Sequence, residues 1–489
     1  MTEKIKSVSR SKTAAFLFLV VVAVFVLRLP FILIDPAVTP DGQTYQTVAD
    51  NIRENRCVSV SSPIGGACEP HWGGNQSPFY PTFIAAVNYL GAETTPLVLL
   101  IQALIYAISA GYLVRVIDRG PVGRSGAILV ALILALSPVQ IAWPRFLLTE
   151  TFALSATLWV FAECLRSIEE KRLRLIPIGA AMVLAVLARY DSILLAIPVA
   201  ATGFIVERPF RAISKGIILA FIVAAPIGIW TARNVSQGLS PVPNTFMKSG
   251  EPTPWGMLMW ADTWVTNLYE GQFSYGIANR DYERGRRLMD VSLFKEERER
   301  NQVEALFDEL ATYQGQPFPE HIDAEFGDLA KQRRETYPLR TWLVVPLQRA
   351  IFLWANPIHS FAWPVELDSV LTPEDRELWS GGGTLGKLEV VSKYPLQATT
   401  KAMVTAYRYG LTVFALVLLV VLLIKPWRPA YFAFALGIGY ALSRNVIIGF
   451  QSSLDSRYSI EGYAVLEVGV VVMLVYLWRR RTGRDELLA

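Results

Sequence analysis

Several stretches of this chain carry no charged residue over the length of a bilayer crossing. Residues 96–114 read PLVLLIQALIYAISAGYLV, and residues 127–143 read AILVALILALSPVQIAW. Apolar runs of about 17 or more residues match the hydrocarbon thickness of a membrane. A helix buried in a soluble protein rarely has to be apolar on every side. These runs therefore predict an integral membrane protein.

The composition agrees with this prediction. Hydrophobic residues make up 52% of the 489-residue chain and charged residues 18%, whereas soluble domains carry about 25% charged residues. The formal net charge is only +4, and the basic residues form short clusters between the apolar runs. Such clusters do not indicate a nucleic-acid partner. The expected neighbours of this chain are membrane lipids.

The apolar segments predict an α-helical polytopic membrane protein with about ten transmembrane helices. The predicted parts are an N-terminal membrane module at 1–232 with a first outer loop at 35–95, an extracytoplasmic domain at 233–408, and C-terminal membrane helices at 409–489. The middle part contains helix-like stretches such as KEERERNQVEALFDELATY at 295–313, so it is predicted to be mainly helical. The apolar segments are 13–34, 96–114, 127–143, 150–165, 175–188, 192–206, 216–232, 409–424, 430–448 and 462–478.

The distribution of lysine and arginine predicts which way the chain faces. If the N-terminus is cytoplasmic, every second connection is cytoplasmic, and these connections hold most of the basic residues outside the long insert, including Arg479, Arg480 and Arg481. The positive-inside rule therefore predicts cytoplasmic termini and two long outer segments. The short loops and basic tails suit a bacterial inner membrane, with the outer segments in the periplasm.

Two of the three cysteines, Cys57 and Cys68, lie in the first outer loop. A disulfide between them is predicted, because such bonds form in oxidising compartments outside the cytoplasm. We expect their Cα atoms to lie within ~7 Å of each other. Cys164 lies in an apolar segment and is interpreted as a small core residue.

Ionisable residues gather at the helix ends that are predicted to face outward. Charges held near membrane depth are costly and are usually functional, so this pattern predicts a cavity open to the outer side. Arginine suits a phosphate in such a cavity, because its planar guanidinium donates two parallel hydrogen bonds. We expect Arg189, Arg233 and Arg457 to converge there with Asp41. The candidates are Asp41, Arg145, Glu150, Arg189, Tyr190, Asp191, Arg233, Asn234, Asp455, Arg457 and Tyr458.

These residues also have structural interpretations. Thr39 or Asp41 can cap the helix that begins there, and Glu150 can interact with the dipole of the helix it begins. Arg189 and Asp191 can pair with each other or extend toward the interface. Sequence spacing alone leaves these alternatives open.

No metal-binding motif is evident in the sequence. His71, His321 and His359 are too scattered to form one, and the neighbouring Glu69 and His71 are interpreted as an ordinary loop. The metal site is therefore unknown. A divalent cation that assists at a phosphate stays a candidate cofactor without a ligand set.

Five stretches, in chain order, resemble one family of membrane enzymes. RLPFILIDPAVTPDGQTYQTVADNI, which contains Arg28, Asp41 and Tyr45, resembles the start of the first outer loop in family 39-type GT-C glycosyltransferases. This family includes protein O-mannosyltransferases and aminoarabinose transferases that act on lipid A. Many members carry two adjacent acids where this chain has Asp41 and Gly42. Later motifs of the family are similar to SPFYPTFIAAV (77–87), SPVQIAWPRFLLTETFAL (137–154), PIGIWTARN (226–234) and SRYSI (456–460).

The resemblance implies a GT-C fold and a sugar donor carried on a polyprenyl phosphate. It implies transfer at the outer face, by a single inverting displacement, to a glycan, lipid or protein acceptor. Asp41 is then the catalytic base, and general-base help is typically worth ~10²–10⁴ in rate. The other implied roles are donor or phosphate binding by Arg189, Arg233, Arg457 and Tyr458, and orientation by Tyr45, Arg145 and Glu150.

Two other functions fit a chain with many helices and a large outer segment. One is a transporter or flippase for a lipid-linked sugar, and the other is a polysaccharide polymerase. Transporters tend to have inverted repeats and ionisable residues at the bilayer midplane. Apart from Glu467 in the last apolar segment, the sequence shows neither feature.

Overall fold

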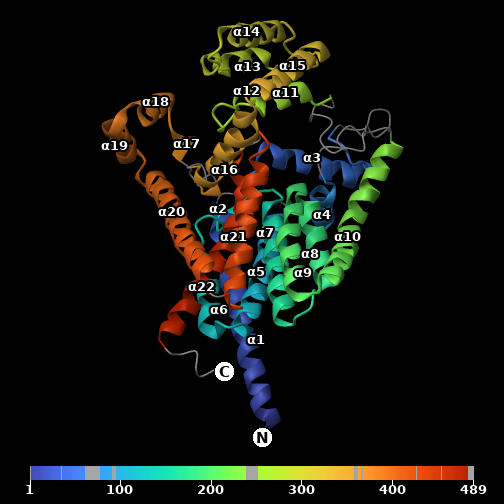
Figure 1. Ribbon diagram of the computed structural model, residues 1–489, viewed down its shortest axis with the longest axis vertical. Coiled ribbons are helices and arrows are strands. Elements are labelled where there is room, and N and C mark those ends of the chain that lie inside the picture. Colours follow the sequence, from blue (N-terminus) through green and yellow to red (C-terminus); the bar gives the residue numbers. More distant parts are fainter. Residues whose placement is uncertain are drawn as a thin grey trace.

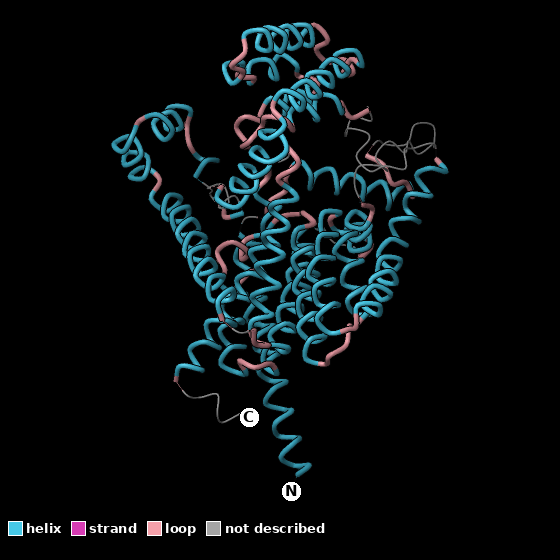
Figure 2. Tube along the Cα trace, in the orientation of Figure 1, coloured by secondary structure: helices cyan, strands magenta, loops and turns pink. Residues whose placement is uncertain are grey.

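In the residues that the computed structural model describes, the regular elements are helices joined by turns and loops, with isolated β-bridges and no β-strand. These residues are 2–34, 36–60, 77–90, 95–237, 252–356, 362–364, 367–425, 427–452 and 454–482. Figure 1 shows a bundle of long helices with a separate group of short helices beyond one of its ends, and Figure 2 shows the loops that join them. The predicted α-helical polytopic membrane protein is confirmed.

Seven of the described helical segments are long and apolar enough to cross a membrane, and three shorter apolar segments accompany them. The long ones are α1 (Thr2–Val26) with α2 (Leu29–Ile34), α5 (Thr95–Arg119), α7 (Glu150–Glu169), α10 (Pro209–Ser236), α20 (Pro395–Ile424), α21 (Tyr431–Ile448) and α22 (Ile460–Arg481). The shorter ones are α6 (Gly123–Leu136), α8 (Leu175–Ala188), and the 3-10 helix η2 (Tyr190–Leu195) with α9 (Ala196–Val206). They follow the predicted segments in number and order.

The third predicted segment, 127–143, is wrong at its end. Helix α6 stops at Leu136, and Ser137 leaves the helical conformation because Pro138 follows it. The chain then forms a buried connection that contains the 3-10 helix η1 (Trp143–Arg145). The side chain of Gln102 on α5 donates to two carbonyl oxygens of this connection, at 3.0 and 2.8 Å. The connection is therefore held inside the bundle, just before α7.

The short helices at the far end belong to the two predicted outer segments. The first segment holds α3 (Pro40–Asn55) and α4 (Phe79–Asn88). Helix α1 begins and α22 ends at the opposite end of the molecule (Figure 1). The second segment holds α11 (Trp255–Ala261), α12 (Phe273–Ala278), α13 (Tyr282–Leu288), η3 (Val291–Leu293), α14 (Glu297–Ala311), α15 (Glu320–Thr336), η4 (Arg340–Val344), α16 (Val345–Ala355), α17 (Leu367–Val370), α18 (Pro373–Gly381) and α19 (Gly383–Lys393).

Helices α11 to α15 form a domain with its own aromatic core. Trp260 lies at the centre of this core, fully buried, and contacts five other aromatic rings. Arg349 on α16 attaches the domain to the bundle. Its buried guanidinium donates to the carbonyl oxygens of Ala261 at 3.1 Å, Val265 at 2.5 Å and Gly449 at 3.4 Å. Gly449 ends α21, so the outer domain is joined directly to the loop that precedes the last helix.

Candidate functional site

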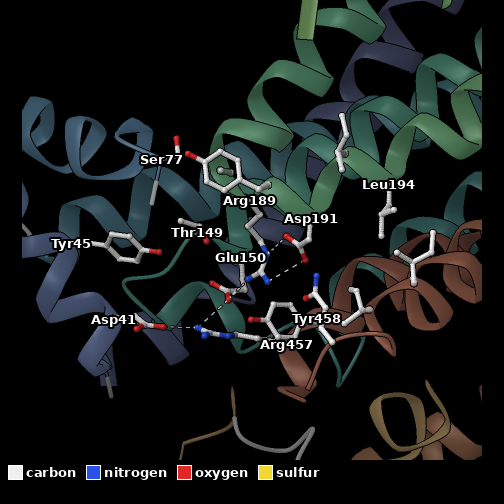
Figure 3. A pocket seen from close by; sticks show the side chains of 16 residues that line it. Asp41, Tyr45, Ser77, Thr149, Glu150, Arg189, Asp191, Leu194, Arg457 and Tyr458 are labelled. Atoms are coloured by element: carbon white, nitrogen blue, oxygen red, sulfur yellow. Dashed lines mark hydrogen bonds and ion pairs between the residues drawn. The ribbon is translucent and has the colours of Figure 1, made fainter. Parts of the chain in front are cut away.

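A cavity of about 500 Å³ lies where the first outer loop, the bundle and the start of the last helix meet. Its lining comes from α3, the start of α7, the connection between α8 and α9, the end of α21 and the 3-10 helix η6 (Ser456–Ser459) before α22. Figure 3 shows the charged side chains gathered on one side of it. Eight predicted site residues line it: Asp41, Tyr45, Glu150, Arg189, Tyr190, Asp191, Arg457 and Tyr458.

Local structure at the start of α3 places Asp41 in this cavity. Thr39 is the N-cap residue, and its hydroxyl accepts a hydrogen bond from the backbone N–H of Gly42 at 3.1 Å. The cap is therefore Thr39 and not Asp41, which resolves one of the alternatives that the sequence left open. Just before the helix, Ala37 forms an isolated β-bridge with Phe146 in the connection before α7. This bridge brings the first turn of α3 against the start of α7.

Gly42 permits this close approach. A Cβ atom at position 42 would lie 2.9 Å from the carbonyl oxygen of Leu147. Any side chain there would push α3 away from the connection before α7. A second acid at position 42 would require such a shift, and Asp41 is the acid that α3 contributes to the cavity.

Asp41 forms an ion pair with an arginine from the far end of the chain. Nη1 of Arg457 donates to Oδ2 of Asp41 at 2.8 Å and lies 3.7 Å from Oε1 of Glu150 (Figure 3). The Nε atom of the same arginine lies 2.9 Å from Oδ2 of Asp455. Arg457 thus connects α3, α7 and the loop before α22.

Arg189 is the centre of a second, more buried set of ion pairs. Its Nη1 donates to Oε1 of Glu150 at 2.5 Å, and its Nε and Nη2 donate to Asp191 at 3.1 and 3.3 Å. Burial lowers the pKa of the Arg189 guanidinium, but Asp191, Glu150 and Glu461 outweigh that effect and raise the pKa well above its ordinary value. Arg189 is therefore a permanent cation at the base of the cavity.

A third arginine, Arg444, lies behind the lining. It is fully buried, and its Nη2 donates to Asp191 at 2.6 Å and to Glu461 at 3.0 Å. Its Nε donates to the carbonyl oxygen of Tyr458 at 2.6 Å. This arginine therefore fixes both Asp191 and the backbone that carries Arg457.

Two further groups on the cavity wall have distinct environments. Burial raises the pKa of the Tyr45 hydroxyl, and the nearby carboxylates of Glu150 and Asp41 raise it further, so Tyr45 stays protonated. Within the described residues, the Oε2 atom of Glu150 is buried and has no hydrogen-bond partner. A buried carboxylate oxygen without a donor is costly, so this atom is suited to accept a hydrogen bond from a bound ligand.

The predicted residues that are not among those lining the cavity are Arg145, Arg233, Asn234 and Asp455. Arg233 lies near the end of α10, where its guanidinium stacks 4.8 Å from the Trp230 ring and donates to the side chain of Asn234. Arg145 is buried with its guanidinium over the Phe146 ring at 4.8 Å, and its carbonyl oxygen accepts from the Ala37 N–H. Arg189 and Arg457 therefore line the cavity together with Asp41, whereas Arg233 is not among the described lining residues, and its predicted role stays a prediction.

The cysteine prediction is tested only in part. Cys57 is buried and disulfide-bonded, whereas Cys164 is buried and free. Cys68, the predicted partner, lies outside the described residues, so the expected separation of the two Cα atoms stays a prediction.

The residues present do not form an evident metal site. Over the described ranges, no three His, Cys, Asp or Glu side chains gather in a way that would hold a metal ion. The cavity carboxylates are instead engaged by guanidiniums. Glu69 and His71, weighed as ligands from the sequence, lie outside the described residues.

Sequence reasoning missed several residues of this site. Arg444 was available as a signal, because a charge inside an apolar spanning segment is usually functional. Glu461 was given no role, although it accepts from Arg444, Ser192, Thr157 and Tyr440. The missed lining residues include Ser77, Thr149 and Gln451, for which the sequence carries no comparable signal.

Comparison with known proteins supports one family over part of the chain. The model of the dolichyl-phosphate-mannose-protein mannosyltransferase family matches residues 75–230. This range includes Glu150 and Arg189 and ends in α10. The resemblance to GT-C membrane glycosyltransferases is thereby confirmed over residues 75–230.

No curated protein matches the chain. Among solved structures, the crystal structure of ArnT from Cupriavidus metallidurans bound to undecaprenyl phosphate is similar, with 15% sequence identity over 96% of this chain and 79% of that chain. The TM-score is 0.38, and a likeness at this level carries no weight of its own.

Proposed function

We propose that this protein is a glycosyltransferase that moves a sugar from a polyprenyl-phosphate donor to an acceptor hydroxyl at the outer face of the membrane. The observation that carries the proposal is the meeting of Asp41 and Glu150 with Arg189 and Arg457 in one cavity. Two carboxylates beside two guanidiniums supply what such a transfer needs, namely a proton acceptor and positive charge for a leaving phosphate. The family match over residues 75–230 supports the same reaction class.

The proposed reaction is a single displacement that inverts the anomeric centre. Asp41 takes the proton of the acceptor hydroxyl as that oxygen forms a bond to the anomeric carbon. The bond between this carbon and the phosphate oxygen breaks, and the polyprenyl phosphate leaves with the electron pair. Positive charge placed at the developing phosphate monoester stabilises the transition state more than the ground state.

Glu150 is proposed to orient the donor sugar. Its buried Oε2 atom, which has no partner among the described residues, is placed to accept a sugar hydroxyl, while its Oε1 atom stays bound to Arg189. Tyr45 and Tyr458 line the same cavity and offer ring faces and hydroxyls to the sugar. The role predicted for Arg233 is not part of this proposal, because that side chain points to Trp230 and Asn234.

The orientation in the membrane is part of the proposal. Elements that line the cavity, α3 and the end of α21 among them, lie toward the end of the bundle that carries the outer helices, opposite the start of α1 (Figure 1). With the charge rule, this arrangement supports cytoplasmic termini and a periplasmic site in a bacterial inner membrane. The helices of 252–393 lie beyond the bundle at the end toward which α3 lies, and they are proposed to help select the glycan, lipid or protein acceptor.

The test is a transfer assay with the purified full-length chain. Radiolabelled polyprenyl-phosphate sugars are incubated with candidate acceptors, and products are separated and checked for a new glycoside of inverted configuration. Movement of the intact donor across a vesicle membrane, with no glycoside formed, would support a flippase instead. Extension of a glycan carried on a lipid diphosphate would support a polymerase.

A further inference from the structure

Negative charge exceeds positive charge around the cavity. In the part of the chain that the structure describes, five carboxylates face three guanidiniums. A polyprenyl-phosphate sugar would add another negative charge. Such a donor gains a strong contact only if an arginine exchanges a carboxylate for the phosphate. The carboxylates are Asp41, Glu150, Asp191, Asp455 and Glu461, and the guanidiniums are Arg189, Arg444 and Arg457.

The three arginines differ in how readily they can make this exchange. Arg444 has no exposed side-chain surface, and the Arg189 side chain is 8% exposed with all three nitrogens donating to carboxylates. The Arg457 side chain is 25% exposed, and its partner Asp41 is equally exposed. A phosphate that enters the cavity therefore meets Arg457 and Asp41 first.

Arg457 is also held in place independently of Asp41. Its Nε atom pairs with Asp455, and its backbone N–H donates to the same carboxylate at 3.0 Å. The next residue, Tyr458, is fixed through its carbonyl oxygen by Arg444. The Nη1 atom of Arg457 can thus change partner while the guanidinium stays where it is.

We infer that Arg457, and not Arg189, binds the donor phosphate, and that the phosphate does so by displacing the carboxylate of Asp41. This inference rests on the proposed function and adds an order of events to it. Before the donor binds, the Oδ2 atom of Asp41 is occupied by the guanidinium. Donor binding releases that oxygen, so the base becomes available to the acceptor only when a sugar is present to receive it. Arg189 remains bound to Glu150 and Asp191 and keeps Glu150 in position.

The experiment measures the affinity of the purified full-length protein in nanodiscs for undecaprenyl phosphate. Two variants each remove one carboxylate charge at the cavity. Asp41→Asn removes the partner of Arg457, and Asp191→Asn removes a partner shared by Arg189 and the buried Arg444. We expect Asp41→Asn to tighten binding roughly two- to fivefold, the range for a partly exposed ion pair that no longer competes. Asp191→Asn should leave binding unchanged or weaken it. Arg457→Gln should weaken binding roughly tenfold or more.

Each result has a separate meaning. Tighter binding by Asp191→Asn alone would overturn the inference in favour of Arg189. Equally tighter binding by both variants would overturn it in favour of a general charge effect. Absence of binding by the wild-type protein would instead refute the proposed donor class. A melting curve for each variant establishes that it folds. If Asp191→Asn does not fold, Arg457→Gln provides the test alone, because unchanged binding by Arg457→Gln would overturn the inference.

Discussion

Oδ2 of Asp41 accepts a hydrogen bond from Nη1 of Arg457 at 2.8 Å, although 416 positions separate the two residues. The first outer loop and the last spanning helix are therefore joined at the candidate site. Since Thr39 caps α3, the carboxylate of Asp41 is not needed to start that helix. The helix and the proposed chemistry can thus be separated by substitution.

We predict that Asp41→Asn abolishes transfer and barely changes stability. The amide is nearly isosteric with the carboxylate but cannot take a proton, so turnover should fall ~10²-fold or more. Turnover with a lipid-linked donor and a melting curve in the same detergent provide the two measurements. Near-wild-type turnover would refute the role of Asp41 as base. Glu150, which lines the same cavity, would then be the next candidate.

Arg444→Lys is expected to destabilise the protein although it keeps the charge. An ammonium group cannot reach Asp191, Glu461 and the Tyr458 carbonyl with the planar geometry that the guanidinium provides. The loss should be about 1–3 kcal/mol, the cost of leaving buried partners unsatisfied. Thermal unfolding in detergent measures it, with the exposed Arg480 as the control position. Equal melting temperatures for Arg444→Lys and Arg480→Lys would show that Arg444 does not organise the site.

Gly42→Ala should displace the first turn of α3. The added Cβ would meet the Leu147 carbonyl oxygen at 2.9 Å, and overpacking of this kind typically costs about 1–3 kcal/mol. Activity should also fall, because Asp41 moves with the turn.

Gly216 on α10 provides the control. A Cβ atom added there would meet open space, so Gly216→Ala should be neutral or stabilising by about 0.5–1 kcal/mol. Melting and turnover are measured for both, and a harmless Gly42→Ala would contradict the close approach.

Mass spectrometry of the proteolysed, non-reduced protein should find Cys57 in a peptide linked to Cys68. Cys57 is disulfide-bonded and Cys164 is free, which leaves Cys68 as the remaining cysteine of this sequence. Cys164 should react with an alkylating reagent only after denaturation, because it is fully buried. A Cys57 thiol that alkylates without prior reduction would contradict the prediction.

The spanning segments were predictable from the sequence because a bilayer imposes one requirement on all of them. Length and apolarity alone locate α5 and α21 within a few residues. The end of α6 was misplaced because residues 137–143 are as apolar as a span, yet they form a connection buried in protein rather than in lipid. Hydropathy does not distinguish these two environments.

The site was predictable where a charge stands at a short outer connection, as for Glu150 and Arg189. Helix ends on one side of a bundle need not face one cavity, however, and Arg233 is not among the described residues that line this one. Its position depends on how α10 is rotated, and its contacts with Trp230 and Asn234 are all within α10 itself. Arg444 and Glu461 were missed because their role comes from contacts with each other and with Asp191, which only the packing of α21 against α22 creates.

The position of Arg457 immediately before the final span also has a consequence for biosynthesis. A chain that enters the bilayer from its N-terminus onward presents Asp41 and Glu150 long before the ribosome reaches residue 457. Until the last crossing is inserted, neither carboxylate has this arginine beside it, and the cavity lacks one wall. On the proposed function, a chain that has not yet inserted the crossing after Arg457 should therefore not transfer a sugar.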